Sequence, residues 1–351
     1  VGSPNIAPEP SIMKALQDAI MVPENYKYAI NELPEMKAAI HDWYKNRYQV
    51  ELTNDEMICL QGSQEALSTL FLAMCDPGDI VLVPDPYYPI FSDGPKIAGA
   101  KVEYMPLLEE YNYVIQLDKI DEEIAKQAKM MIVSYPNNPT CAVAPDSFYE
   151  DLIAFAKKYD IVVLHDNAYS ELVFDGKVGK SFLSFEGAKE VGIELNSFSK
   201  TYGMAGARLG VCVGNKEVIE CYNTLKSNMD YGIFLPVQYA GIEALRHGGA
   251  SIHSTCQAYQ DRRDALCEIF DSVGWHIASS PATMFAWARI PDQYEDSYAF
   301  TKDLLEKTGI VVTPGQAFGV HGKRYVRLAL VQDIEDIKEA AQRIKKSEIF
   351  K

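Results

Sequence analysis

Lys200 lies among hydroxyl groups and glycines in a way that could bind a reactive ligand. Ser197 and Ser199 precede it, Gly203 follows, and Arg208 comes eight residues later. A lysine amine forms an imine with an aldehyde, and a lysine held in an apolar site is a usable nucleophile. Hydroxyls, loop N–H groups and a guanidinium fork together suit a phosphate. The segment therefore predicts a site for a ligand that carries both an aldehyde and a phosphate.

Two alternatives for this segment stay open at this stage. Most lysines are solvated surface charges, and Ser199 can have a purely structural role. The glycines could also form a dinucleotide loop, but they lack the G-x-G-x-x-G spacing, which disfavours an NAD-dependent dehydrogenase. Lys200 follows a predicted strand, Ile193–Ser197, and ligands bind at strand ends in open α/β sheets. This position favours a ligand site.

Polar residues follow three further predicted strands. Gly62, Ser63 and Gln64 come after the strand Met57–Leu60 and open a helix, whose N-terminus favours a phosphate unless it is an ordinary β–α turn. Asp166 follows the run 161–165 and is either a helix cap or a site group. Asn138 follows the run 130–134 in a Pro- and Asn-rich segment that could be only a turn. All of them are candidates for one site at the carboxyl edge of a sheet.

Two more side chains have a possible role in binding. Arg327 lies inside the apolar strand Tyr325–Leu330, where a charge is costly unless it is paired, so it is a candidate carboxylate clamp. Tyr88 follows the strand Ile80–Val83 and either packs in the core or offers a stacking face.

These residues need a scaffold, and the hydrophobic pattern predicts one. Short β-rich runs alternate with amphipathic helical stretches such as Gln64–Met74 and Ser147–Lys158, which is typical of an α/β domain with a mainly parallel sheet. From about Arg246 the pattern changes to a long helix, then the short strands 282–288, 310–313 and 325–330, and a final helix, Asp333–Lys346. This change predicts a second, α+β domain. The seven runs of the first domain are 57–60, 80–83, 102–105, 130–134, 161–165, 193–197 and 209–213.

The composition limits the classes of protein. The 351 residues are 48% hydrophobic, enough for more than one domain, and a net charge of −16 disfavours partners such as nucleic acid or an anionic membrane. Seven cysteines without a C-x-x-C pair indicate reduced thiols, and we expect a cytoplasmic protein. The six histidines show no metal-binding spacing, and neither a membrane span nor a signal peptide is evident.

Taken in order, these elements resemble the class I/II aminotransferases, the fold-type I enzymes that use pyridoxal 5′-phosphate (PLP). The resemblance implies a three-layer α/β/α large domain with a mainly parallel seven-stranded sheet over residues 25–245. It also implies a smaller α+β domain from residues 1–24 and 246–351, and a homodimer with shared active sites. The family usually has an N-terminal arm before the point that matches Val1, so such a segment either is missing here or was never present.

The resemblance also implies a role for each candidate residue. Lys200 would hold the aldehyde of PLP and later move the substrate's α-proton, giving ping-pong transfer of an amino group from an L-amino acid to a 2-oxo acid. Tyr28, with Tyr26 as a rival, would reach the partner's phosphate. The other roles are phosphate binding by Gly62, Ser63, Gln64, Ser197, Ser199 and Arg208, pairing with the pyridine nitrogen by Asp166, contact with the ring hydroxyl by Asn138 and Tyr169, stacking by Tyr88, and binding of the substrate carboxylate by Gly2, Asn138 and Arg327.

The same residues leave room for other functions. A PLP-dependent carbon–sulfur β-lyase needs the same lysine, aspartate and arginines and differs in which bond breaks. A non-catalytic PLP-binding regulator is a more distant alternative. Such proteins carry a DNA-binding domain and basic patches, which the net charge of −16 disfavours. The sequence leaves the amino-acid donor open.

Overall fold

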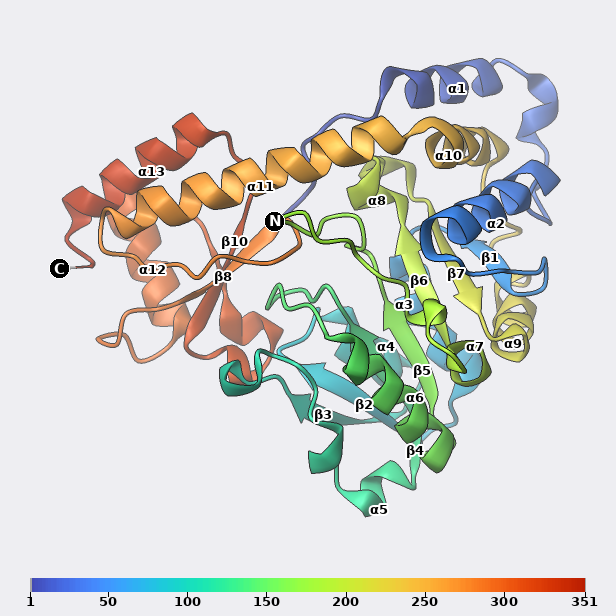
Figure 1. The fold of residues 1–351 in the computed structure, drawn as a ribbon, viewed down its shortest axis with the longest axis horizontal. Helices are drawn as coiled ribbons and strands as arrows, with labels where there is room; N and C mark the ends of the chain where they lie inside the picture. The colour runs from blue at the N-terminus through green and yellow to red at the C-terminus, as the bar shows by residue number, and fades with distance from the viewer. Residues whose placement is uncertain (1, 351) are drawn as a thin grey trace.

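A computed structural model describes residues 2–350, and its centre is a seven-stranded sheet in the order β1-β7-β6-β5-β4-β2-β3 (Figure 1). Only β7 runs antiparallel to its neighbours, β1 and β6, so the sheet is mainly parallel as predicted. Its strands are β1 (Met57–Leu60), β2 (Ile80–Asp85), β3 (Lys101–Pro106), β4 (Ala128–Ser134), β5 (Val162–Asp166), β6 (Gly192–Ser197) and β7 (Gly210–Gly214).

Helices cover both faces of this sheet because its central strands are apolar on both sides. Alternate residues of one strand belong to different cores. In β4, Met131 and Val133 pack in the core that includes α2 and α6, whereas Met130 and Ile132 pack in the core that includes α3 and α9. The predicted three-layer α/β/α arrangement is thus confirmed. The helices of this part are α2 (Pro34–Tyr48), α3 (Ser63–Met74), α4 (Ile90–Ile97), α5 (Glu122–Ala125), α6 (Asp146–Tyr159), α7 (Ala188–Val191), α8 (Phe198–Thr201), α9 (Lys216–Lys226) and α10 (Leu235–His247).

The C-terminal part forms a smaller α+β unit with its own core. Its antiparallel sheet has the order β8-β10-β9, and the long helix α11 runs across the top of the molecule from α10 to this unit (Figure 1). Trp275 and Phe300 lie in its core. Its elements are α11 (Gly249–Asp271), β8 (Phe285–Arg289), α12 (Ser297–Thr308), β9 (Thr313–Pro314), β10 (Tyr325–Ala329) and α13 (Ile334–Ser347).

The N-terminal segment contacts both units. Asn5 donates a hydrogen bond from its side chain to the Val331 carbonyl (2.7 Å), next to the small sheet. Helix α1 (Pro10–Ile20) instead packs on α10, and Ile12 belongs to the core of the large sheet. The division into 25–245 and 1–24 with 246–351 therefore stays a prediction, and the contacts of α1 lie with the large unit.

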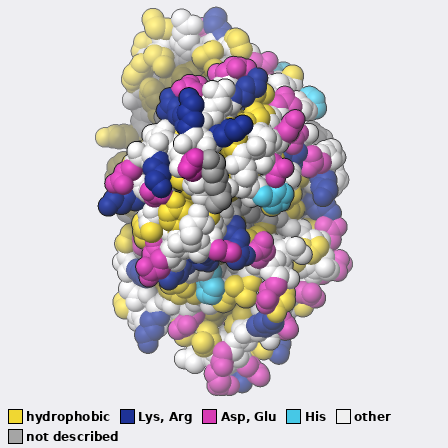
Figure 2. Space-filling model, turned by 90° about the vertical axis from the view of Figure 1, so that its left-hand side faces the viewer, with side chains coloured by type: hydrophobic (Ala, Val, Ile, Leu, Met, Phe, Trp, Pro, Cys, Tyr) yellow, Lys and Arg dark blue, Asp and Glu magenta, His cyan; other side chains and the backbone are white. Residues whose placement is uncertain are grey.

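The surface mixes charges of both signs. Figure 2 shows the end of the molecule formed by the small unit, where basic and acidic side chains alternate without a large basic patch. Among the described residues, no helix combines the length and apolar character needed to cross a membrane.

Candidate active site

Lys200 lies on α8, the single helical turn that follows β6 at the carboxyl edge of the sheet. Ser197 caps this turn, because its hydroxyl oxygen accepts a hydrogen bond from the Ser199 N–H (3.2 Å). Burial lowers the pKa of the Lys200 amine; the Asp166 carboxylate opposes this shift, while the Arg208 and Arg327 cations add to it. A larger fraction of neutral amine makes Lys200 a better nucleophile and base.

Arg208 and the start of α3 form a tight cradle on one side of this lysine. Gly62 has φ +76°, and a Cβ there would lie 2.4 Å from Nη2 of Arg208. A Cβ on Gly210 would lie 2.8 Å from the Ser63 N. The helix N-terminus and the guanidinium therefore meet where only glycine fits, and both favour an anion such as phosphate.

We expect Gly62→Ala to weaken binding of a phosphate ligand, for which PLP is the probe, about 10- to 150-fold. The added methyl group would displace Arg208, and a hydrogen bond to a charged group contributes about 1.5–3 kcal/mol. Titration of the cofactor-free protein with PLP measures the effect. Gly78→Ala is the matched control, because Gly78 also has a positive φ (+98°) but no atom lies within 4 Å of its Cβ position. An equal loss of PLP affinity in the two variants would contradict a phosphate site formed by Arg208 and the start of α3.

Asp166 ends β5 and has a free oxygen. Its side chain is only 6% exposed, and Oδ1 has no hydrogen-bond partner among the described residues. Burial raises the pKa of Asp166 to about 6, against the opposing charges of His165 and Lys200. The residues after it form turns and no helix, so it is not a helix cap. A buried oxygen without a partner fits an N–H donor from a ligand, as the pyridine nitrogen of PLP would provide.

The raised pKa predicts that Asp166→Asn stabilises the cofactor-free protein above pH 6. An ordinary Asp has a pKa near 3.8 and Asp166 one of about 6, so its ionisation favours the unfolded chain. The resulting loss in the free energy of unfolding begins near pH 4 and is complete above pH 6, where it reaches about 3 kcal/mol. Urea unfolding of both proteins at pH 4 and pH 8 measures it. If the two proteins still differ in their free energy of unfolding at pH 4, the ionisation of Asp166 is not the cause. The same variant should also bind PLP more weakly.

Arg327 faces the site from β10 of the small unit. Its Nη1 donates a hydrogen bond to Oδ1 of Asn138 (2.7 Å), and Nε is buried without a partner among the described residues. The guanidinium lies 4.1 Å from the ring centre of Phe285 and 4.6 Å from that of Phe318. Burial lowers the pKa of Arg327. A desolvated cation with donors to spare attracts a carboxylate, so this geometry suits a carboxylate clamp.

The remaining candidates surround these groups. Tyr88 donates a hydrogen bond from its hydroxyl to Oε1 of Gln64 (2.8 Å), which fixes the ring beside the start of α3. Burial raises the pKa of Tyr169, and its ring packs edge-on against Phe285 (5.9 Å between centres). Gly2 approaches the same phenyl ring, because a Cβ on it would lie 2.4 Å from Cε1 of Phe285.

Tyr28 is the exception among the predicted site residues. It is 77% exposed and its ring packs against Tyr231 (5.3 Å between centres). Its rival Tyr26 donates to the Ile20 carbonyl (3.0 Å) and packs against Phe234. In a single chain, both rings therefore pack against residues outside the predicted site.

The sequence did not single out Phe285 and Phe318 as walls of the Arg327 site. Phe285 lies in an apolar stretch that resembles ordinary core and Phe318 in a glycine-rich segment, and only the cation over their rings distinguishes them. Cys141 follows the turn that contains Asn138 and has φ +64°, in the left-handed region that favours glycine. The turn thus keeps a glycine-like conformation although its residue is a cysteine.

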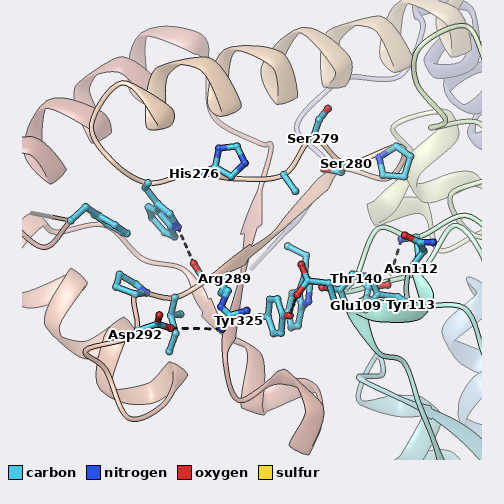
Figure 3. Close-up of a pocket in the computed structure, with 18 of the residues that line it drawn as sticks. Glu109, Asn112, Tyr113, Thr140, His276, Ser279, Ser280, Arg289, Asp292 and Tyr325 are labelled. Atoms are coloured by element: carbon cyan, nitrogen blue, oxygen red, sulfur yellow. Dashed lines mark hydrogen bonds and ion pairs between the residues drawn. The ribbon is translucent and has the colours of Figure 1, made fainter.

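A separate cavity of about 750 Å³ lies between the two units (Figure 3). Glu109 and Tyr113 line it from the large unit, and Arg289 and Tyr325 from the small one. The Tyr325 hydroxyl donates to Oε2 of Glu109 (2.7 Å) across the gap. None of the predicted site residues lines this cavity, so it is distinct from the Lys200 group.

Comparison with known proteins identifies the family. The sequence profile "Aminotransferase class I and II" matches residues 1–344. The LL-diaminopimelate aminotransferase of Halothermothrix orenii is 45% identical over 99% of this chain and 90% of that protein. The enzyme of the same name from Moorella thermoacetica is 41% identical over 99% and 89%.

Solved structures agree with this assignment. Substrate-bound BacF from Bacillus subtilis superposes with a TM-score of 0.96 at 38% identity, covering 98% of this chain and 88% of that one. A probable N-succinyldiaminopimelate aminotransferase from Thermus thermophilus superposes with a TM-score of 0.93 at 33% identity, covering 99% and 93%. This chain is therefore a transaminase that belongs to the class I and II aminotransferase family.

Proposed function

We propose that this aminotransferase binds PLP at Lys200 and transfers an amino group from a diaminopimelate-type donor to a 2-oxo acid. The observation that carries the cofactor assignment is the unpartnered Oδ1 of Asp166, in the described part of the chain, beside a lysine of lowered pKa. The donor is inferred from the relatives named LL-diaminopimelate aminotransferase, at 39–45% identity over nearly the whole chain.

Each residue of the site has its own role in the proposed reaction. PLP supplies, when bound, an electron sink for the negative charge that forms at the substrate Cα. Asp166 accepts a hydrogen bond from the ring nitrogen, and Arg208 with the start of α3 holds the phosphate. Arg327 and Asn138 hold the substrate carboxylate, and the Lys200 amine takes the proton from the substrate Cα and later returns it. The lowered pKa of Lys200 supports this role, because only the neutral amine accepts a proton.

A donor screen tests the proposal. LL-diaminopimelate, L-aspartate, L-alanine and L-cystathionine would be offered with 2-oxoglutarate or pyruvate, and the amino acid formed from the acceptor would be measured. We expect the highest kcat/KM with LL-diaminopimelate. A stronger response to another donor would overturn the donor assignment. Release of pyruvate from cystathionine without an acceptor would instead establish the β-lyase.

A homodimer with shared sites is part of the proposal. The exposed rings of Tyr28, Tyr231, Tyr26 and Phe234 form one aromatic patch, and such patches mark protein interfaces. In a second copy placed on this patch, Tyr28 would reach the partner's phosphate site.

Tyr28→Phe should therefore weaken PLP binding about 3- to 10-fold, the loss of one hydrogen bond, and leave the dimer intact. Cofactor titration and sedimentation measure the two effects. Tyr26→Phe is the control, because its hydroxyl is already bonded to the Ile20 carbonyl. If only Tyr26→Phe weakens PLP binding, Tyr26 is the residue that reaches the partner's phosphate site. A protein that is monomeric in solution would contradict active sites shared between two subunits.

We also place the protein in the cytoplasm, with small molecules and no nucleic acid as its partners. All seven cysteines are free, as is usual where thiols are kept reduced. The acidic net charge of −16 disfavours nucleic acid.

A further inference from the structure

A lysine amine is buried between helices α9 and α3, next to the cradle described above. Lys226 is the last residue of α9 and is only 3% exposed. Its Nζ donates one hydrogen bond to Oε1 of Glu65 (2.6 Å) and another to Oδ2 of Asp230. Glu65 lies in the first turn of α3, the helix whose start forms the cradle with Arg208. Lys226 therefore joins the end of α9 to the start of α3.

Both carboxylate partners of this lysine also hold Gln61, the residue before Gly62. Oε2 of Glu65 accepts a hydrogen bond from the Gln61 N–H (2.6 Å). Oδ2 of Asp230 accepts one from the Gln61 side-chain amide (3.1 Å), and its Oδ1 accepts one from the Gly232 N–H (2.9 Å). Gln61 is thus fixed by its backbone and by its side chain, through two carboxylates that share one lysine amine.

The backbone at Gln61 in turn contacts Arg208. Nη2 of Arg208 donates a hydrogen bond to the Gln61 carbonyl (3.4 Å), and its Nη1 donates one to the Ala205 carbonyl (2.9 Å). The guanidinium also lies against Gly62, where an added Cβ would be 2.4 Å from Nη2. A shift of this backbone would therefore move an acceptor that orients the guanidinium and a wall that encloses it. Because hydrogen bonds weaken quickly with poor geometry, such a shift would weaken the binding of an anion.

We propose that Lys226 is a positioning residue that keeps the cradle in shape for a phosphate group. It acts through its two carboxylate partners on Gln61, and through Gln61 on Arg208. The expected effect on PLP rests on the proposed function, whereas the effect on the Gln61 backbone does not. If Lys226 only stabilised the contact between α9 and α3, its loss would lower the affinity for every part of the cofactor alike.

Amide hydrogen exchange of the cofactor-free protein tests the positioning without a ligand. In Lys226→Met the side chain stays long and unbranched but loses its donors, so neither carboxylate is held any longer. The Gln61 N–H should then exchange about 10-fold faster than in the wild type, as expected when the support of one hydrogen bond is lost. Unchanged exchange of this N–H in a folded variant would overturn the proposal.

Gln61→Ala tests the same link from the surface. The Gln61 side chain is exposed, and exposed substitutions seldom affect folding, so this variant serves even if Lys226→Met folds poorly. It removes the bond from the side-chain amide to Asp230 and leaves both bonds of the Lys226 amine in place. Its effect on the cradle should therefore have the same direction as that of Lys226→Met and be smaller.

Titration of the cofactor-free protein with PLP and with pyridoxal, which lacks the phosphate, tests the consequence. We expect Lys226→Met to weaken PLP binding about 10-fold and Gln61→Ala about 3-fold, the range for the loss of one hydrogen bond. The affinity for pyridoxal should stay within about 2-fold of the wild type, because no phosphate contact can be lost. Equal losses for the two ligands would assign Lys226 a structural role only and contradict the proposal.

Lys189→Met is the matched control. Lys189 makes the same kind of contact at the opposite end of β1, where its Nζ donates to both carboxylate oxygens of Glu56 (3.0 Å each). The side chain of Glu56 is 14% exposed, close to the 13% of Glu65. The control should change neither the exchange of the Gln61 N–H nor the ratio of the two affinities. The same changes in Lys189→Met as in Lys226→Met would refute a specific role for Lys226.

The two measurements also separate this proposal from the proposed function. Faster exchange of the Gln61 N–H in Lys226→Met, together with an unchanged affinity for PLP, would refute the role of Lys226 in phosphate binding. A wild type that does not bind PLP would reject the proposed cofactor instead, and faster exchange in Lys226→Met would then still support the positioning of Gln61.

Discussion

Lys200→Ala should abolish turnover, lowering kcat by at least about 10⁴-fold, the upper range for a single general acid–base group. The variant should also lose the visible absorbance that bound PLP gains from its link to a lysine. The structural reason is that the Lys200 amine is partly buried, interacts with Asp166 and Arg208, and has a pKa lowered by burial. Spectra of the purified protein and the initial rate of amino transfer check both effects.

The control for this prediction is Lys189→Ala. Lys189 lies on α7 and binds Glu56 (3.0 Å) near the surface, so its removal should change the rate little. Full activity in the Lys200 variant would reject the mechanism. Loss of activity with retained visible absorbance would move the cofactor link to another lysine.

Arg327→Ala should lower kcat/KM for amino-acid donors about 30- to 5,000-fold, mostly through KM. Truncating one partner of a buried charged contact costs about 2–5 kcal/mol. Arg327 meets the conditions for a large effect, because it is partly buried, bonded to Asn138 and packed against Phe285 and Phe318. Steady-state kinetics with several donors give the separate changes in kcat and KM.

Arg289→Ala is the matched control for this arginine. Arg289 lies on the neighbouring strand β8 and is exposed, where it forms a long ion pair with Asp292 (3.7 Å). Its removal should leave KM unchanged. An unchanged KM for Arg327→Ala would remove Arg327 from the substrate site, and a loss that is confined to kcat would assign it a role other than binding.

The sequence predicted the large sheet well because its strands are apolar on both faces. Continuous runs such as Met130–Ser134 leave few alternatives to a buried strand, and β4 includes that run within Ala128–Ser134. The bounds of the edge strand in the small sheet were predicted less accurately. The run 310–313 was expected to be a strand, but β9 is only Thr313–Pro314, because a short edge strand has one neighbour to fix its length.

The placement of the N-terminal helix could not be read from its residues. Helix α1 has an apolar stripe that could pack on either unit, and residues 1–24 were expected to join the small one. Packing of Ile12 against the core of the large sheet depends on the path of the chain after Gly2, which is a long-range property. Local pattern determines that a helix forms and has an apolar face, but not which surface covers it.

By itself the sequence determined which chemistry is available. It supplied a lysine, an aspartate and two arginines, each at a strand end or inside a strand, and the strand alternation that brings the carboxyl ends of β4, β5 and β6 to one edge. Only the tertiary structure decided which of these groups are desolvated and which have free atoms. The orphaned oxygen of Asp166 and the bond from Lys226 to Glu65 arise from contacts between segments far apart in the chain. Because desolvation and pairing set the charge of a group, the chemistry of this site follows from the fold as much as from the residues.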